Sequence, residues 1–406
     1  MSWFSTLEQA PPIEVFDLLK QYPNDDFPQK VNLSAGAYRT NEEKPWVLPV
    51  VRTAETALLN DEKVNKEYLP ILGFEAFSKL ATRILLGDDS VALAENRAFG
   101  VQCLSGTGSL RVGAEFLATK LGKTVFYYSN PTWGNHRLVF LNAGFKDARE
   151  YRYWDAENRS LDLNGLLEDL NNAPEGAVII LHACAHNPTG CDPTQDQWRE
   201  VARVIKEKKL FPFFDSAYQG FATGDLDKDA WAVRFFVKEG LELLCGQSFA
   251  KNFGLYNERV GNLSIVLNNP EKIPAVKSQI TLIVRGMYSN PPAHGARIVH
   301  YVLSNNELYD QWRDNIKTMS SRIKEMRQKL REELERIGAP GSWNHVTDQI
   351  GMFSYTGLNA AQSQHLVKKY HVYMLSTGRI SMCGLTPSNV EYVAKCIKET
   401  LTEIPA

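Results

Sequence analysis

The sequence predicts an α/β protein with a mostly parallel central sheet. Short apolar runs recur between about residue 100 and residue 270, and amphipathic, charge-rich stretches such as 195–209 lie between several of them. Apolar runs that alternate with helical patterns are typical of βαβ units, whose parallel sheet is covered by helices on both faces. The runs that we expect to form strands are 124–128, 177–181, 210–214, 241–244 and 263–267.

Polar residues cluster directly after these runs. The clusters are SNPTWGNH at 129–136, HACAHNPTG at 182–190, DSAY at 215–218 and QSFAKN at 247–252. Because ligands of open α/β sheets bind at the carboxyl ends of the strands, we expect the four segments to meet at one site.

The last third of the chain predicts one long helix and a smaller α+β unit. Apolar residues recur at intervals of three and four from Leu308 to Ile337, and Gly338 marks the end of the pattern. This spacing indicates an amphipathic helix long enough to bridge two domains. Beyond it we expect strands at 350–355 and 371–375 and a closing helix at 388–403.

Composition excludes several classes of protein. The 406 residues carry a formal net charge of −2, which offers no general attraction to nucleic acid or anionic lipid. No run of 18 apolar residues predicts a membrane span. The cysteines lie mostly inside apolar runs, and the first 26 residues are acidic rather than Arg-rich, so we expect reduced thiols and a cytoplasmic protein.

A Ser/Gly-rich segment precedes a helical pattern at Ser105, Gly106 and Thr107. Hydroxyls and free backbone N–H groups at a helix N-terminus can hold a phosphate, although an N-cap with turn glycines explains the segment equally well. It is not a dinucleotide fingerprint, because Arg111 occupies the place of the third glycine.

His182, Cys184 and His186 alternate, so a strand would place all three on one face and a zinc site is conceivable. The chain has no CxxC motif and no further Cys/His pair at ligand spacing. We therefore expect no metal, and buried histidines with satisfied hydrogen bonds.

Three further residues bear chemistry. Asp215 ends an apolar run, where a buried carboxylate needs a cationic partner, and Tyr218 follows three residues later. Lys251 is flanked by apolar residues, and desolvation lowers the pKa of a lysine and suits it to Schiff-base chemistry. A lysine, an acid and an anion site match the needs of pyridoxal phosphate, which carries an aldehyde, a pyridinium nitrogen and a phosphate.

The chain resembles the aspartate aminotransferases of the cytosolic eukaryotic type, which are fold-type I pyridoxal-phosphate-dependent transferases. Motifs along essentially the whole chain carry the resemblance: VNLSAGAYR (31–39), EYLPILG (67–73), LSGTGSLR (104–111), NPTWGNH (130–136), HACAHNPTG (182–190), DSAYQGFA (215–222), SFAKNFGLYNERVG (248–261), RGMYSNPP (285–292) and GRISMCGL (378–385).

The resemblance implies a role for each matching position. Lys251 would be the catalytic lysine that carries the cofactor, Asp215 would pair with its ring nitrogen, and Tyr218 would bind its phenolic oxygen. His136 would support Asp215, and Trp133 would stack on the ring. The further residues implied to bind the cofactor are Ser105, Gly106, Thr107, Asn187, Ser248, Arg259 and the partner's Tyr68. Those implied to bind substrate are Gly36, Trp133, Asn187, Arg379 and, from the partner subunit, Arg285 and Ser289.

The resemblance also implies a homodimer with shared active sites and an arm at 1–12. The small domain would comprise 13–46 and 318–406, and the large cofactor-binding domain would span 47–317. The implied reaction moves the amino group of L-aspartate to 2-oxoglutarate, giving oxaloacetate and L-glutamate.

Three other functions can be weighed against that of an aspartate aminotransferase. Ser248-x-x-Lys251, Tyr288-Ser-Asn290 and Ser376-Thr-Gly378 imitate penicillin-recognising serine hydrolases, but the last triplet lacks its lysine. A non-enzymatic binding module would predict loss of Lys251 or Asp215. An aromatic or broad-specificity aminotransferase of the same fold is the serious alternative.

Overall fold

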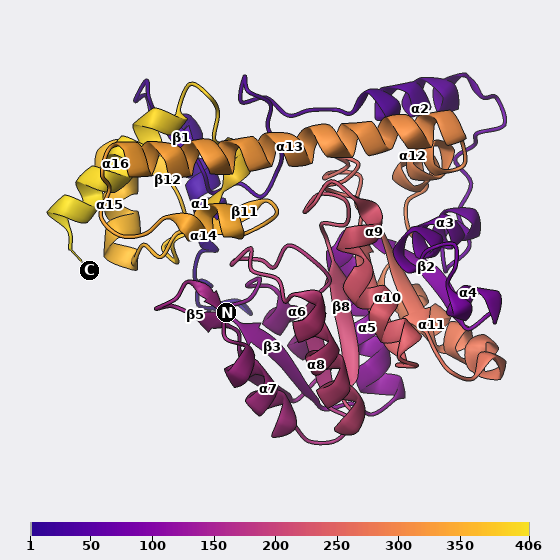
Figure 1. The fold of residues 1–406 in the computed structure, drawn as a ribbon. Coiled ribbons are helices and arrows are strands. Elements are labelled where there is room, and N and C mark those ends of the chain that lie inside the picture. Colours follow the sequence, from indigo (N-terminus) through magenta and orange to yellow (C-terminus); the bar gives the residue numbers. More distant parts are fainter. Residues whose placement is uncertain (1, 406) are drawn as a thin grey trace.

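The computed structural model describes residues 2–405, and a seven-stranded sheet forms its centre (Figure 1). The strand order is β2-β10-β9-β8-β7-β3-β4. The strands are β2 (Ala98–Leu104), β3 (Val125–Asn130), β4 (Asp147–Arg152), β7 (Val178–His182), β8 (Phe211–Ser216), β9 (Leu243–Ser248) and β10 (Val260–Val266). All neighbours pair in parallel except β10, which is antiparallel to both β2 and β9, so the predicted mostly parallel sheet is confirmed.

Helices cover both faces of this sheet. Alternate residues along a strand point to opposite faces, as Phe213 and Phe214 do in two separate apolar clusters. The helices on the Phe214 face include α7 (Leu163–Asn171), α8 (Gln195–Glu207) and α10 (Trp231–Lys238). Those on the Phe213 face include α5 (Ser105–Lys120), α6 (His136–Asn142) and α11 (Ile273–Met287).

A 31-residue helix, α13 (Asn306–Arg336), crosses the top of the molecule in Figure 1. Asn305 caps its start by accepting a hydrogen bond from Leu308 N, and Gly338 follows its end at φ +66°. Its apolar face packs against α16 (Val390–Glu403) in the third apolar cluster. The predicted long helix and its stop are confirmed.

The segments at the two chain ends form a second, smaller unit, seen on the left of Figure 1. Val31 of β1 (Val31–Asn32) pairs in parallel with Val372 of β12 (Val372–Tyr373), and β11 (Phe353–Tyr355) is antiparallel to β13 (Arg379–Ser381). Its helices are α1 (Glu14–Gln21), α14 (Asn344–Asp348), α15 (Ala360–Tyr370) and α16. We call this set of elements the terminal unit.

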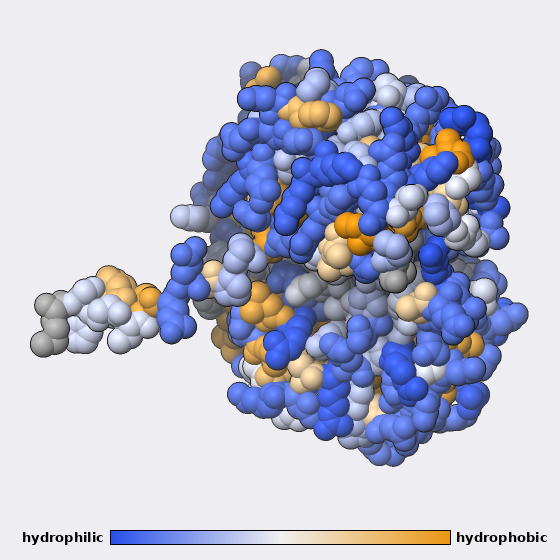
Figure 2. Space-filling view, turned by 90° about the vertical axis from the view of Figure 1, so that its left-hand side faces the viewer, coloured by the Kyte–Doolittle hydropathy of each residue, from blue (hydrophilic) through white to orange (hydrophobic). Residues whose placement is uncertain are grey.

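The remaining elements complete the described chain. The helices are α2 (Pro49–Asn60), α3 (Glu75–Leu86), α4 (Val91–Ala94), α9 (Leu226–Asp229) and α12 (His294–Leu303), and a small hairpin joins β5 (Trp154–Asp155) to β6 (Ser160–Leu161). An arm projects from the body of the molecule in Figure 2, and it carries Trp3 and Phe4 with exposed side chains. None of the described helices combines the length and apolarity that crossing a membrane requires.

His182, Cys184 and His186 do not share the face of a strand, as the discounted zinc arrangement would require, because β7 ends at His182 and the chain then turns. Ala185, with φ +51°, lies in the left-handed region that breaks strand alternation.

Candidate active site

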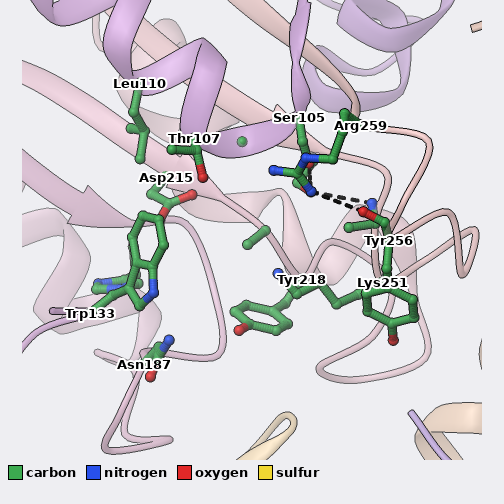
Figure 3. A pocket seen from close by; sticks show the side chains of 15 residues that line it. Ser105, Thr107, Leu110, Trp133, Asn187, Asp215, Tyr218, Lys251, Tyr256 and Arg259 are labelled. Atoms are coloured by element: carbon green, nitrogen blue, oxygen red, sulfur yellow. Dashed lines mark hydrogen bonds between the residues drawn. The ribbon is translucent and has the colours of Figure 1, made fainter. Parts of the chain in front are cut away.

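A cavity of about 160 Å³ lies at the carboxyl ends of the central strands. All four polar segments reach it, so the predicted convergence is confirmed. The predicted site residues that line it are Ser105, Gly106, Thr107, Trp133, Asn187, Asp215, Tyr218, Ser248, Lys251 and Arg259 (Figure 3).

Strand register places the polar groups at one level. His182, the last residue of β7, pairs with Asp215, and Asp215 pairs with Gly246 of β9. Two residues beyond Gly246, Ser248 ends β9 opposite Gly261. Three neighbouring strands therefore deliver an imidazole, a carboxylate and a hydroxyl to the same edge of the sheet.

The carboxylate of Asp215 is buried and hydrogen-bonded to His136. His136 Nε2 lies 3.0 Å from Asp215 Oδ2, and His136 Nδ1 lies 2.8 Å from Thr132 Oγ1. Burial alone would raise the pKa of Asp215, but the hydrogen bond from His136 and nearby positive charge, including that of Lys251, outweigh it and hold the pKa below its usual value. Asp215 is thus set to remain an anion inside the protein.

His182 departs from the expectation of satisfied histidines. It is buried in the wall of the cavity, and neither ring nitrogen has a hydrogen-bond partner among residues 2–405. Burial, reinforced by His136, lowers the pKa of His182 to about 3, so the ring is neutral. His186, by contrast, is satisfied by Ser129 and Thr189 at 2.8 Å each.

The side chains of His136, His182 and Asp215 lie close enough together to hold a metal ion. One ligand atom each from His136, His182 and Asp215 lies within 4.8 Å of the others. His136 and Asp215 are already joined to each other at hydrogen-bonding distance. The absence of a metal therefore stays a prediction.

Lys251 lies in the turn after β9, and its ammonium nitrogen is 5.1 Å from the centre of the Tyr218 ring. Burial lowers the pKa of Lys251, and the positive charge of Arg259 adds to that effect while Asp215 opposes it. A hydrogen bond also holds the turn in place, because Trp312 Nε1 of α13 donates to Asn252 O at 2.8 Å. A buried amine of lowered pKa is suited to nucleophilic and acid–base work.

The opposite end of the cavity has the features of an anion site. Ser105 begins α5 with φ +61°, and its hydroxyl lies 3.0 Å from that of Ser248. Gly261 permits this approach, since a Cβ there would lie 2.4 Å from the Ser105 backbone. Arg259 donates to Tyr256 O at 3.0 Å and faces Ser105 in Figure 3. A helix N-terminus, hydroxyls and a guanidinium together favour a phosphate.

Arg379 lies on β13 of the terminal unit, beside the cavity. Its guanidinium donates to Ser34 O at 2.9 Å and to Asn187 Oδ1 at 3.5 Å, and it lies 4.1 Å from the centre of the Phe353 ring. Burial lowers its pKa to about 10, which still leaves it cationic at neutral pH. Gly36 is close by, since a Cβ there would lie 3.3 Å from the Phe353 ring.

Besides Gly36 and Arg379, three predicted residues lie outside the cavity of a single chain: Tyr68, Arg285 and Ser289. Tyr68 is exposed, and Arg285 is exposed and donates to Ser289 Oγ at 2.5 Å. Their predicted contacts lie in the active site of the partner subunit, so these roles stay predictions. Sequence reasoning missed Tyr256, which lines the cavity. Its hydroxyl accepts a hydrogen bond from Tyr38 N at 2.9 Å, which helps to hold the ring in place.

Comparison with known proteins identifies the family. Residues 28–397 match the family described as "Aminotransferase class I and II". Curated relatives named "Aspartate aminotransferase, cytoplasmic" from Gallus gallus and Caenorhabditis elegans are each 57% identical, over at least 99% of this chain and 99% of theirs. The chain therefore belongs to the class I and II aminotransferases.

Solved structures agree with this assignment. The cytoplasmic aspartate aminotransferase of Saccharomyces cerevisiae is 46% identical with a TM-score of 0.96, over 99% of both chains. An aromatic-amino-acid aminotransferase from Burkholderia pseudomallei, covalently bound to pyridoxal phosphate, is 40% identical with a TM-score of 0.96, over 99% of this chain and all of its own.

The cavity fits pyridoxal phosphate. Ser105 and Arg259 lie at one side of it in Figure 3, Trp133 and Asp215 at the other, and Lys251 and Tyr218 below. A Cβ at Gly106 would lie 3.2 Å from Ser248 Cβ and narrow the anion end of the cavity. An amine, an acid and an anion site are thus arranged around one cavity, as the cofactor's aldehyde, ring nitrogen and phosphate require.

Proposed function

We propose that this chain uses the cavity around Lys251 to transfer amino groups between dicarboxylates. It has aspartate aminotransferase activity, depends on pyridoxal phosphate and is cytoplasmic, like its relatives at 57% identity. The reaction exchanges the amino group of L-aspartate with 2-oxoglutarate and gives oxaloacetate and L-glutamate. The observation that carries this function is the buried Lys251 amine in the same cavity as the buried Asp215 carboxylate.

We assign the cofactor contacts as follows. Lys251 binds the aldehyde, Asp215 pairs with the ring nitrogen, and Trp133 stacks on the ring. Tyr218 and Asn187 bind the phenolic oxygen. The phosphate is held by Ser105, Gly106, Thr107, Ser248, Arg259 and the partner subunit's Tyr68. When bound, the cofactor supplies an electron sink for the bond that breaks at the substrate's α-carbon.

The protein's own groups supply the proton transfer. The Lys251 amine, freed when the substrate amine takes its place, moves a proton between the α-carbon and the cofactor carbon that bore the aldehyde. Its lowered pKa makes the neutral amine, the form that accepts a proton, more accessible near neutral pH. His136 holds Asp215 ionised, so the carboxylate keeps the ring nitrogen protonated.

Two arginines define the substrate class. Arg379, buried beside Asn187, binds the α-carboxylate that every amino acid carries, with help from Trp133 and the backbone at Gly36. Arg285 of the partner subunit, with Ser289, binds the second carboxylate of aspartate or glutamate. A guanidinium binds a carboxylate through two parallel charge-assisted hydrogen bonds, which explains a preference for dicarboxylates.

The family relationship supports a homodimer, and we propose that its active sites are shared. Tyr68 and Arg285 are exposed in one chain and lie outside its own cavity, as residues that complete a partner's site should. The arm seen in Figure 2, which exposes the side chains of Trp3, Phe4 and Leu7, offers further surface for the partner.

We also propose that the chain is divided into two domains. Pairing of β1 with β12 supports a small domain built from 13–46 and 318–406. The seven-stranded sheet lies entirely within 47–317, the proposed large domain.

A substrate panel tests the proposed specificity. Purified protein should be yellow, and its visible absorption should shift when aspartate or glutamate is added. With 2-oxoglutarate as acceptor, aspartate should react with a higher kcat/KM than phenylalanine, tyrosine or leucine. An equal or higher kcat/KM for phenylalanine would favour the aromatic or broad-specificity alternative.

A further inference from the structure

The segment that carries Asn187 is held in a strained conformation. It leaves β7 after His182, and Ala185 adopts φ +51°. For a residue with a Cβ, the left-handed region is sterically unfavourable. Gly351 of the terminal unit leaves room for this conformation, because a Cβ there would lie 2.4 Å from Ala185 Cβ.

One carboxylate holds the strained backbone in place. Asp192 Oδ2 accepts a hydrogen bond from Ala185 N at 2.6 Å, and Oδ1 accepts one from His186 N at 2.8 Å. Burial raises the pKa of Asp192 to about 6, against the opposing effect of these two hydrogen bonds. The group is therefore an anion above neutral pH, where both hydrogen bonds are charge-assisted and strong.

The held backbone leads directly to the substrate arginine. His186, fixed through both ring nitrogens, precedes Asn187. Asn187 Oδ1 in turn accepts the 3.5 Å hydrogen bond from Arg379. The Asp192 carboxylate thus holds the backbone directly before Asn187, whose side-chain amide contacts the Arg379 guanidinium.

We infer that Asp192 is a positioning residue of the substrate site: its carboxylate fixes the backbone before Asn187, and Asn187 fixes the guanidinium of Arg379. The inference rests on the proposed function, in which Arg379 binds the α-carboxylate. Without the Asp192 carboxylate, Ala185 can relax out of the left-handed region and move the Asn187 side chain away from Arg379. Substrate carboxylates should then bind more weakly, while the ring-nitrogen end of the cavity stays intact.

A binding measurement on the holoenzyme tests this role. Succinate is a dicarboxylate that has no amine and cannot react, so its Kd reports the carboxylate sites alone. Asp192→Ala should raise the Kd of succinate about tenfold or more, because a carboxylate contact that is misplaced loses much of its charge-assisted strength. Asp192→Asn, which keeps the shape and one acceptor oxygen, should give a smaller rise.

Asp162 provides a matched control. Its carboxylate also accepts a backbone hydrogen bond, from Gly165 N at 2.8 Å, but it caps α7 and does not line the cavity. Asp162→Ala should lower the unfolding temperature, as Asp192→Ala does, and change the Kd of succinate less than twofold. KM for aspartate should follow the same order as the Kd values.

Hydrogen exchange separates the inference from the proposed function. The amides of Ala185 and His186 should exchange faster in both Asp192 variants than in the wild type and Asp162→Ala. If the wild type binds succinate and neither Asp192 variant changes its Kd, or if Asp162→Ala raises the Kd equally, the positioning role is overturned. If the wild-type protein does not bind succinate, the dicarboxylate function is contradicted instead, and unchanged amide exchange in the variants would still refute the role of Asp192.

Discussion

His136 and Asp215 form a hydrogen-bonded pair at the wall of the cavity, with His136 Nε2 3.0 Å from Asp215 Oδ2. The pair joins the first residue of α6 to Asp215, the penultimate residue of β8, which lies 79 positions later in the sequence. Because Thr132 engages the other ring nitrogen, the histidine is fixed in the orientation that meets the carboxylate.

Asp215 and His136 should affect the rate unequally. Asp215→Asn should lower kcat on the order of 10²-fold or more, since a preorganised charge opposite the ring nitrogen is lost. His136→Asn should cost only about tenfold, because it weakens the support of a carboxylate that remains. Stopped-flow measurement of the aspartate half-reaction, with thermal melting as the control for folding, distinguishes the two. Equal losses of kcat in the two variants would contradict the prediction that Asp215 acts directly on the ring nitrogen and His136 only through Asp215.

Lys251 should be the site of covalent attachment. Borohydride reduction followed by peptide mapping should find the label on Lys251. Lys251→Ala should retain the cofactor through its phosphate and ring contacts but lose about 10²–10⁴-fold in rate, the usual contribution of a positioned base. Lys209→Ala removes an exposed lysine on the protein surface and serves as the control. Label on another lysine would refute the assignment.

Arg285 should determine which substrates are accepted. Arg285→Asp should lower kcat/KM for aspartate on the order of 10²-fold or more, because repulsion replaces a charge-assisted contact. Activity with phenylalanine should change little, and arginine should become a better substrate. Arg379→Ala should depress all three. An equal loss for aspartate and phenylalanine in Arg285→Asp would contradict the assigned role.

Shared sites predict recovery of activity in hybrid dimers. A hybrid of one Lys251→Ala subunit and one Arg285→Asp subunit carries both lesions in one site and leaves the other site intact. Equal mixing with random reassembly should therefore restore about a quarter of wild-type activity, as expected for a two-fold dimer. Mass spectrometry of the intact dimer confirms that hybrids have formed. Hybrids without activity would show that Arg285 does not act in the partner's site.

Asp229 should make stability depend on pH. Its carboxylate accepts hydrogen bonds from Thr223 Oγ1 and from Ala222 N, but burial prevails and raises its pKa to about 6. The folded protein therefore binds this proton more tightly than the unfolded chain, and the resulting stability is lost as pH rises from about 4 to about 6. Relative to Asp229→Asn, the wild type should lose up to about 3 kcal/mol of unfolding free energy over this range. Parallel stability curves would contradict the raised pKa.

The sequence predicts the central strands because they are buried on both faces and read as apolar runs. It does not reveal β4 (Asp147–Arg152), an edge strand in which Tyr151 alone is fully buried and four of the other five residues are charged. The antiparallel direction of β10 also escapes prediction, because an apolar run carries no information about strand direction.

The site is predictable where residue type alone implies chemistry, as at Lys251 and Asp215. The anchoring role of Asp192 is not, because it depends on the left-handed turn at Ala185 that brings two N–H groups to one carboxylate. Tyr256 escapes for the same reason, since only the folded chain brings its ring to the cavity wall.

Helix α13 ties the two sides of the reaction together. In the first turns of α13, Trp312 donates a hydrogen bond to the turn that bears Lys251. The last turns of α13 pack against α16, in the unit that bears Arg379. A helix of 31 residues spans about 46 Å, so a single element connects the turn that bears Lys251 with the unit that bears Arg379. A loosened contact between α13 and α16 should therefore lower catalytic activity, although it lies far from any reacting atom.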